Sequence, residues 1–305
     1  MQAAGWDAAR TRSQALAAQW QRSAERRMLA ATFDDPTATD LPLARRRAET
    51  LLGDAGWAEA LIAPLVSALR DEPLLDPPLR VNREGGRIGA VLFEAPAVRL
   101  SVSILSAAAL AAAPEPAKVA LTGRVAVTRY LAAGDALVQR WTAPPIVDGI
   151  VPAEGASLHG THRPHDGAVS VLDGRTEGQV MLAATRDVVT LTALLRAGAA
   201  PLMRQYATRD GTLMRSATTD DGASRAAMLL TLLRVSGRAD AAATFEAASR
   251  DRTHHLRWSA MREWLATDAR SAWPRLAEMA AGDPHPEVRG AARATLARVA
   301  ERRAA

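Results

Sequence analysis

The sequence of 305 residues contains no cysteine, a single lysine (Lys118) and few aromatic side chains, which make up 4% of the chain. Without cysteine, the chain can form no disulfide, no thiolate nucleophile and no cysteine-ligated zinc site. The net charge of +5 therefore rests almost entirely on arginine. The densest basic run, Arg45-Arg46-Arg47, is followed closely by Glu49. We interpret it as a solvated helix face, so the sequence gives no clear signal for nucleic-acid binding.

Long apolar runs and common catalytic motifs are also missing. No apolar run is long enough to span a membrane, and residues 1–20 lack the apolar segment of a signal peptide. The patterns Gly-x-x-x-x-Gly-Lys, Gly-x-Gly-x-x-Gly and Gly-x-Ser-x-Gly do not occur. Nucleotide binding and serine-hydrolase chemistry therefore have no sequence signal. We expect a soluble cytoplasmic protein with no membrane contact, and the sequence predicts no oligomeric state and no catalytic residue.

Residues 79–217 are predicted to form a β-domain. The stretch from Val98 to Ile104 alternates apolar and polar side chains, which is typical of a half-buried strand. Short strands with turns about every ten residues indicate an antiparallel sandwich or barrel. The predicted strands are residues 87–93, 98–104, 119–131, 136–142, 168–172, 179–184, 188–195, 202–208 and 212–217.

Helical periodicity precedes and follows this β-domain. Residues 1–72 are predicted to form three helices, the first running from residue 2 to about residue 31, with Asp34-Asp35-Pro36 ending it. Residues 219–305 contain five helices of similar length, which is how an α-solenoid is built. These helices are expected at about residues 223–235, 239–249, 254–266, 270–281 and 284–303. The predicted fold class is α+β: a central antiparallel β-sandwich or barrel, N-terminal helices and a C-terminal α-solenoid segment.

The last predicted helix has a characteristic start. Asp283 can cap it and Pro284 suits its first turn, while Val288, Ala292 and Leu296 share one face. The stretch 283–289, which reads Asp-Pro-His-Pro-Glu-Val-Arg, resembles the second half of a HEAT repeat. The resemblance covers about residues 270–300 and implies a HEAT-like array. Because that family consists chiefly of interaction scaffolds, the resemblance also implies a protein partner.

Three of the six histidines lie within seven residues, at His159, His162 and His165. Imidazole is the commonest metal ligand, and Glu177 or Asp166 would complete a set for Zn²⁺ or Fe²⁺. Side chains three residues apart on a strand point to opposite faces, so the histidines converge only if they lie in a loop. Residues 144–164 are rich in proline and glycine and are predicted to be such a loop. The alternative is a solvated loop without a metal.

The central region, with its glycine-containing turns and a histidine-bearing loop before a strand, resembles a cupin. Cupins place two histidines one residue apart and a glutamate four or five residues later. This chain has His159-x-x-His162-x-x-His165 and then Glu177. The resemblance therefore implies a cupin-like fold without the standard metal centre.

Two further groups lie among the C-terminal helices. His254 and His255 are adjacent, and adjacent residues on a helix do not share a face, so we predict a structural role for them. Trp258, Arg262 and Trp273 are candidates for partner binding, because aromatic and arginine side chains dominate binding hot spots. The alternative is that the tryptophans are buried between helices, because alanine-rich helix faces need large side chains to fill the space between them.

Two functions from different classes follow. The first is a binding or scaffold protein without a cofactor, acting through HEAT-like helices and a cupin-like β-domain. The second is a cupin-type enzyme that depends on non-haem iron or zinc, held by His159, His162, His165 and Glu177.

Overall fold

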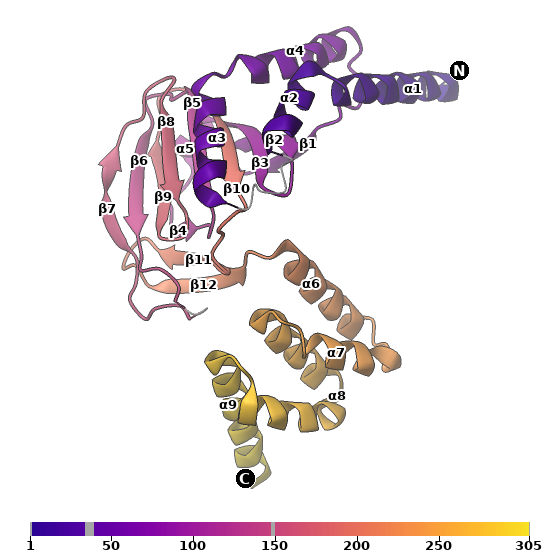
Figure 1. Ribbon diagram of the computed structural model, residues 1–305, viewed down its shortest axis with the longest axis vertical. Helices are drawn as coiled ribbons and strands as arrows, with labels where there is room; N and C mark the ends of the chain where they lie inside the picture. The colour runs from indigo at the N-terminus through magenta and orange to yellow at the C-terminus, as the bar shows by residue number, and fades with distance from the viewer. Residues whose placement is uncertain (1, 34–39, 148–149, 305) are drawn as a thin grey trace. The chain divides into compact units, whose positions relative to one another are not determined.

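The computed structural model describes residues 2–33, 40–147 and 150–304. The chain divides into two compact units (Figure 1). The first comprises residues 1–147 and 151–216, and the second comprises residues 148–150 and 217–305. The stop signal predicted at Asp34-Asp35-Pro36 lies outside the described residues.

The first unit contains three antiparallel sheets. A six-stranded sheet has the order β1-β2-β3-β10-β5-β8, and the three-stranded sheets have the orders β12-β11-β4 and β7-β6-β9. The α+β class is confirmed, whereas the strands of the described residues do not close into a barrel. The strands are β1 (Arg80–Glu84), β2 (Arg87–Glu94), β3 (Val98–Leu105), β4 (Lys118–Leu121), β5 (Val125–Ala132), β6 (Leu137–Thr142), β7 (Ser157–His162), β8 (Val169–Asp173), β9 (Glu177–Ala183), β10 (Val188–Leu195), β11 (Leu202–Ala207) and β12 (Leu213–Thr218).

One strand prediction and one loop prediction were wrong. The single strand expected at 119–131 is split into β4 and β5, which belong to different sheets. Gly123 lies between them with φ +75°, a left-handed conformation that breaks an extended strand and that favours glycine. The loop expected at 144–164 contains β7, which pairs with β6.

Helices α1 (Gln2–Gln21), α2 (Ala24–Phe33), α3 (Leu41–Gly53) and α4 (Gly56–Asp71) precede the sheets, and α5 (Ala107–Ala112) follows β3. The single first helix predicted from residue 2 to residue 31 breaks between α1 and α2. Ser23 lies at the break, and its Oγ accepts a hydrogen bond from the backbone N–H of Arg26, as an N-cap does. No single described helix is long and apolar enough to cross a membrane, although α3 and α4, bent by 65°, meet those criteria as a pair.

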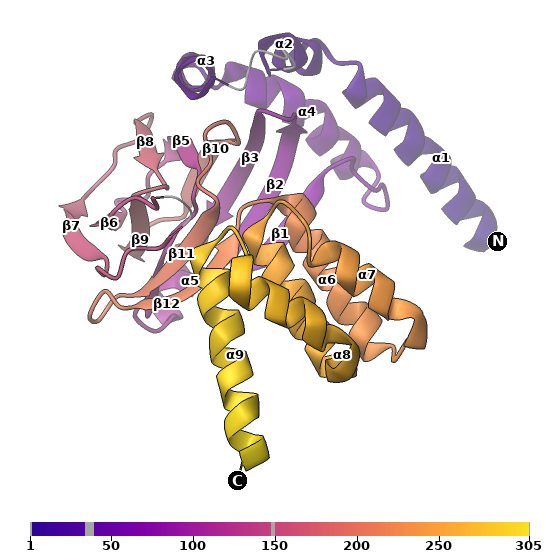
Figure 2. The same ribbon diagram turned by 60° about the horizontal axis from the view of Figure 1, so that its bottom comes forward.

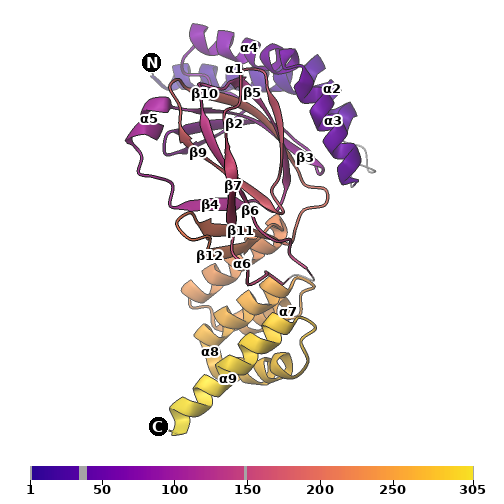
Figure 3. The same ribbon diagram turned by 90° about the vertical axis from the view of Figure 1, so that its left-hand side faces the viewer.

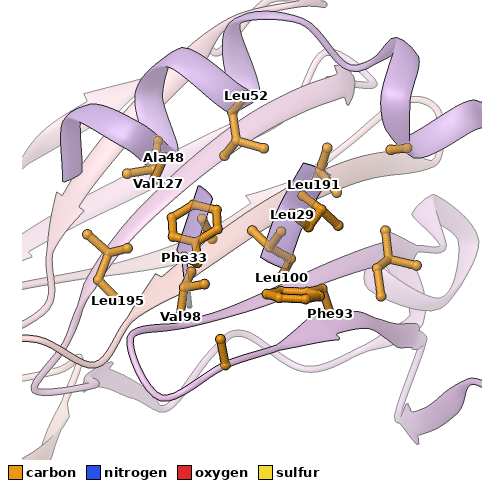
Figure 4. Close-up of a cluster of buried hydrophobic side chains, with 14 of the residues drawn as sticks. Leu29, Phe33, Ala48, Leu52, Phe93, Val98, Leu100, Val127, Leu191 and Leu195 are labelled. Carbon is orange, nitrogen blue, oxygen red and sulfur yellow. The ribbon is translucent and has the colours of Figure 1, made fainter. Parts of the chain in front are cut away.

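The main core of this unit lies between α2, α3 and α4 and one face of the six-stranded sheet (Figure 4). Val98 and Leu100 of β3 point into it, as do Leu191, Ala193 and Leu195 of β10. The alternation seen in the sequence thus places every second residue of these strands against the helices. The intervening residues lie on the other face of the sheet.

The second unit consists of α6 (Asp221–Val235), η1 (Ala239–Ala241), α7 (Ala242–Ala248), α8 (His254–Gly282) and α9 (Pro286–Ala304) (Figure 2). Helix α8 is interrupted at Asp268, whose φ of −148° and ψ of 89° are not helical. The carboxylate of Asp268 accepts hydrogen bonds from the N–H groups of Arg270 and Ser271, and so caps the second half. Two helices were predicted here, and the chain indeed bends between them.

The C-terminal helices share a separate core. Val288 and Ala292 of α9 are buried with Leu276 and Met279 of α8, and Leu296 packs against the same cluster while half-buried. The predicted pairing of these two helices is confirmed. Their membership of the HEAT family stays a prediction.

Candidate functional site

The second face of the six-stranded sheet is polar. Ser101 and Ser103 of β3 pair in register with Thr192 and Thr190 of β10, and Thr192 pairs in turn with Thr128 of β5. The Ser103 and Thr190 hydroxyls are hydrogen-bonded at 3.0 Å, and the Thr128 and Thr192 hydroxyls at 3.2 Å. All five side chains are only half-buried. We call this surface, continued on β8 by Ser170, the inner face.

The sheet β7-β6-β9 lies opposite the inner face, so that the two form a sandwich (Figure 3). Arg140 of β6 crosses between them and donates a hydrogen bond from Nη2 to Ser170 Oγ at 3.4 Å. An apolar cluster occupies the space between the sheets beside this contact; it includes Tyr130 of β5, Val138 of β6 and Val188 of β10. The interior is therefore apolar in one part and polar around Arg140.

Arg140 is the central charged group of this interior. Its side chain is 25% exposed, and its Nη1 lies 3.9 Å from Glu177 Oε1, a long and therefore weak ion pair. Glu177 Oε2 accepts a hydrogen bond from the Asp173 N–H at 3.0 Å. The Nε of Arg140 is buried and has no hydrogen-bond partner. A buried donor without a partner costs free energy and marks a place where a ligand acceptor would be stabilised.

The positive charge of Arg140 affects the pKa values of two neighbouring side chains, Tyr130 and His162. Burial raises the pKa of Tyr130, against the opposing effects of a hydrogen bond with Gln179 and of the charges of Arg140 and Arg87. Burial, and then the positive charge of Arg140, lower the pKa of His162. The raised pKa of Tyr130 and the lowered pKa of His162 both favour the uncharged side chain, so neither adds a charge beside Arg140 at neutral pH.

The structure separates the residues predicted to form a metal site. His162 and Glu177 both lie beside Arg140. His159 is exposed and lies in a β-bulge of β7, where the register passes from Gly160 to Leu158. His165 is exposed in a turn, with Nδ1 2.9 Å from its neighbour's backbone oxygen.

The prediction that a loop brings the three histidines together was wrong, because part of the expected loop is the strand β7. Residues 157–162 pair with β6, which fixes His159 and His162 on a strand. Among the described residues, the one group of three ligand-bearing side chains close enough to share an ion is His254, His285 and Glu287, in the second unit. The sequence signal for this group was the adjacent pair His254 and His255. His285 lies 30 residues further along the chain, and nothing in the sequence connected it with that pair.

The predicted partner-binding residues lie in the second unit. Trp258 and Trp273 are half-buried and pack against the helical core, and Arg262 is exposed. The packing agrees with the alternative interpretation of the tryptophans as core residues. A protein partner stays a prediction.

No known family model matches the chain, and no curated protein matches it. Solved structures similar to it include the Schizosaccharomyces pombe Cnp3 cupin domain (12% identity, TM-score 0.24, 36% of this chain and 60% of that one). Others are a cupin domain from Bordetella pertussis Tohama I (14%, TM-score 0.24, 38% and 99%) and ectoine synthase from P. lautus (9%, TM-score 0.25, 46% and 85%). At these TM-scores the similarity carries no assignment of activity or ligand.

Proposed function

We propose that the β-domain binds a small hydroxylated carboxylate on its inner face. The observation that carries this proposal is Arg140, a guanidinium inside the sandwich with a buried, unpartnered Nε. Arginine presents donors in a planar fork that matches a carboxylate, and such charge-assisted hydrogen bonds are strong. The ligand's carboxylate would take the place beside Arg140.

The hydroxyl part of the ligand is inferred from the serine and threonine rows. Ser101, Ser103, Thr128, Thr190 and Thr192 offer hydroxyls that both donate and accept hydrogen bonds. Because the main hydrophobic core lies on the opposite face of the sheet, these side chains are not part of it. A sheet face that is polar, half-exposed and enclosed by a second sheet is suited to a polar ligand.

A second positive charge supports an anionic ligand. Arg87 of β2 donates from Nη1 to Ser103 Oγ at 3.1 Å, at the border of the inner face. Its charge acts on Tyr130 together with that of Arg140. The inner face thus has a guanidinium at its border as well as the one in its interior.

Substitution of Arg140 tests the proposal. We expect full-length protein, screened by calorimetry against lactate, malate and gluconate and against polyols of equal size, to bind at least one of the acids. Arg140→Gln should weaken that binding by roughly tenfold or more, since a hydrogen bond to a charged group contributes about 1.5–3 kcal/mol. The matched control is Arg209→Gln, which removes the same charge from a side chain that is 85% exposed.

Two outcomes would contradict the proposal. Polyols that bind as tightly as the acids would show that the charge of Arg140 plays no part. Equal affinity of Arg140→Gln and the parent for an acid would place the binding elsewhere. The metal-dependent enzyme predicted at His159, His162, His165 and Glu177 stays a prediction; among the described residues, no three of these side chains form a group close enough to share an ion.

A further inference from the structure

The second unit gathers three histidines where α8 and α9 begin. The His254 and His285 rings are stacked, with centroids 3.7 Å apart and planes 5° from parallel. The His255 ring lies 3.7 Å from that of His254 at 44°. Residues from two helices that are far apart in the sequence thus form one imidazole cluster.

The nitrogens of this cluster lack partners. His254 Nε2, His255 Nε2 and both ring nitrogens of His285 are buried and accept or donate no hydrogen bond within the described residues. Buried polar atoms of native proteins nearly always have a partner, because an unpartnered one costs about 1–3 kcal/mol. Four such atoms in one place leave ring nitrogens that a ligand would satisfy.

A carboxylate completes the set. Single ligand atoms of His254, His285 and Glu287 all lie within 4.8 Å of one another. Glu287 is exposed in the first turn of α9, so its carboxylate can turn toward the imidazoles. Two imidazoles and a carboxylate are a ligand set found at zinc sites, whereas Ca²⁺ and Mg²⁺ prefer oxygen ligands alone.

The backbone around the cluster is fixed by a buried ion pair. Arg257, one turn after His254, donates from Nε and Nη2 to the carboxylate of Asp283 at 2.9 and 2.6 Å. The same carboxylate accepts a hydrogen bond from the His285 N–H at 2.8 Å. The two side chains of the pair are 7% and 1% exposed. One contact thus holds the starts of both helices and the histidines attached to them.

We propose that His254, His285 and Glu287 form a binding site for Zn²⁺ or a similar divalent transition-metal ion. Tetrahedral coordination with Zn–N distances of about 2.0–2.1 Å places two ligand nitrogens about 3.4 Å apart. The ligand atoms must therefore approach by up to about 1.4 Å, and the stacked His254 and His285 rings must turn out of parallel so that their in-plane lone pairs aim at one ion. Rotations of the side chains supply both movements. The His255 ring, 3.7 Å from that of His254, adds a third imidazole to the cluster.

The metal would link the start of α8 to the start of α9 and so stabilise the folded unit. Its binding can therefore be measured without an activity assay. In chelator-treated, untagged full-length protein, calorimetry with Zn²⁺ should give one site per chain and a higher melting temperature, because the ion binds the folded state alone. His285→Asn, which keeps a polar side chain of similar size, should weaken the affinity by roughly tenfold or more. Glu287→Gln should weaken the Zn²⁺ affinity too. Because Glu287 is exposed, this substitution should not disturb folding, so the weaker affinity would come from the lost ligand.

The matched controls are His159→Asn and His165→Asn, both exposed histidines of the first unit. They should leave the Zn²⁺ affinity unchanged. Co²⁺ provides a second reading, since a tetrahedral site gives intense visible absorption that His285→Asn should abolish. The proposal is overturned if chelator-treated protein melts at the same temperature with and without Zn²⁺. It is also overturned if the affinity depends on His159 or His165 rather than on His285 and Glu287.

Discussion

At the scale of the residue, the pKa of His162 should change when a ligand binds to the inner face. The charge of Arg140 contributes to the low pKa of His162, so an anion bound beside Arg140 offsets that charge. Binding should therefore raise the pKa of His162. By linkage, the ligand binds more tightly as pH falls through the range between the two pKa values, because the protonated imidazole is favoured in the complex.

The measurement is the titration of histidine ring protons by NMR, with and without an acid found in the calorimetric screen. His162→Gln assigns the resonance. His159, which is exposed and lies in the bulge of β7, is the internal control, and its ring-proton resonances should be the same in both samples. A His162 resonance that is unmoved by a saturating acid would mean that the ligand does not approach Arg140.

Single residues also show where prediction from the sequence ended. The periodicity of residues 98–104 correctly separated the core-facing Val98 and Leu100 from Ser101 and Ser103. Nothing in the sequence marked Arg140 among the many arginines, because its role comes from the strand opposite. His285 likewise joins His254 only through the packing of α8 on α9.

At the scale of the element, Asp283 both follows α8 as its C-cap residue and closes an ion pair. Burial alone would raise its pKa, but the hydrogen bonds from Arg257 and from the His285 N–H lower the pKa below its usual value. Asp283→Ala should lower the free energy of unfolding of the helical unit by roughly 3–5 kcal/mol, because Arg257 is left buried and unpaired.

The control for this change is Asp220→Ala. Asp220 caps α6 by accepting hydrogen bonds from the Gly222 and Ala223 N–H groups, so its loss should cost only about 1 kcal/mol. Urea denaturation followed by circular dichroism measures both. Equal losses for the two variants would show that Asp283 acts as a cap and that its pairing with Arg257 adds nothing.

Strands could be predicted from the sequence where one of their faces is buried. They could not be predicted where both faces are exposed. Strands β3 and β10 follow the alternation that the sequence displays. Strand β1 is exposed along its whole length and β7 along most of it, so no apolar period marks them. The break between β4 and β5 depends on the left-handed Gly123, which the apolar run around it concealed.

At the scale of the whole molecule, two separate cores predict two melting transitions. Leu100 belongs to the core of the first unit and Phe245 to that of the second, and both are fully buried. Calorimetric scans should show that Leu100→Ala and Phe245→Ala each lower one transition, with losses of roughly 2–5 kcal/mol. Zn²⁺ should raise only the transition that Phe245→Ala lowers.

A single transition lowered by both substitutions would mean that the cores unfold cooperatively. The sequence placed the change from β to helical periodicity near residue 219, and the contacts divide the chain between residues 216 and 217. It did not indicate that α2, α3 and α4 share a core with the sheet, because the amphipathic pattern of a helix does not say which surface it covers.

The location of the core on the outer, helix-covered face of the six-stranded sheet has an evolutionary consequence. Residues such as Ser101, Thr128 and Thr192 carry little of the packing that keeps the domain folded. Substitutions at these half-buried positions leave the main core intact, so their cost in stability is small. Descendants of this chain can therefore change the inner face while Val98, Leu100 and Leu191 stay as they are.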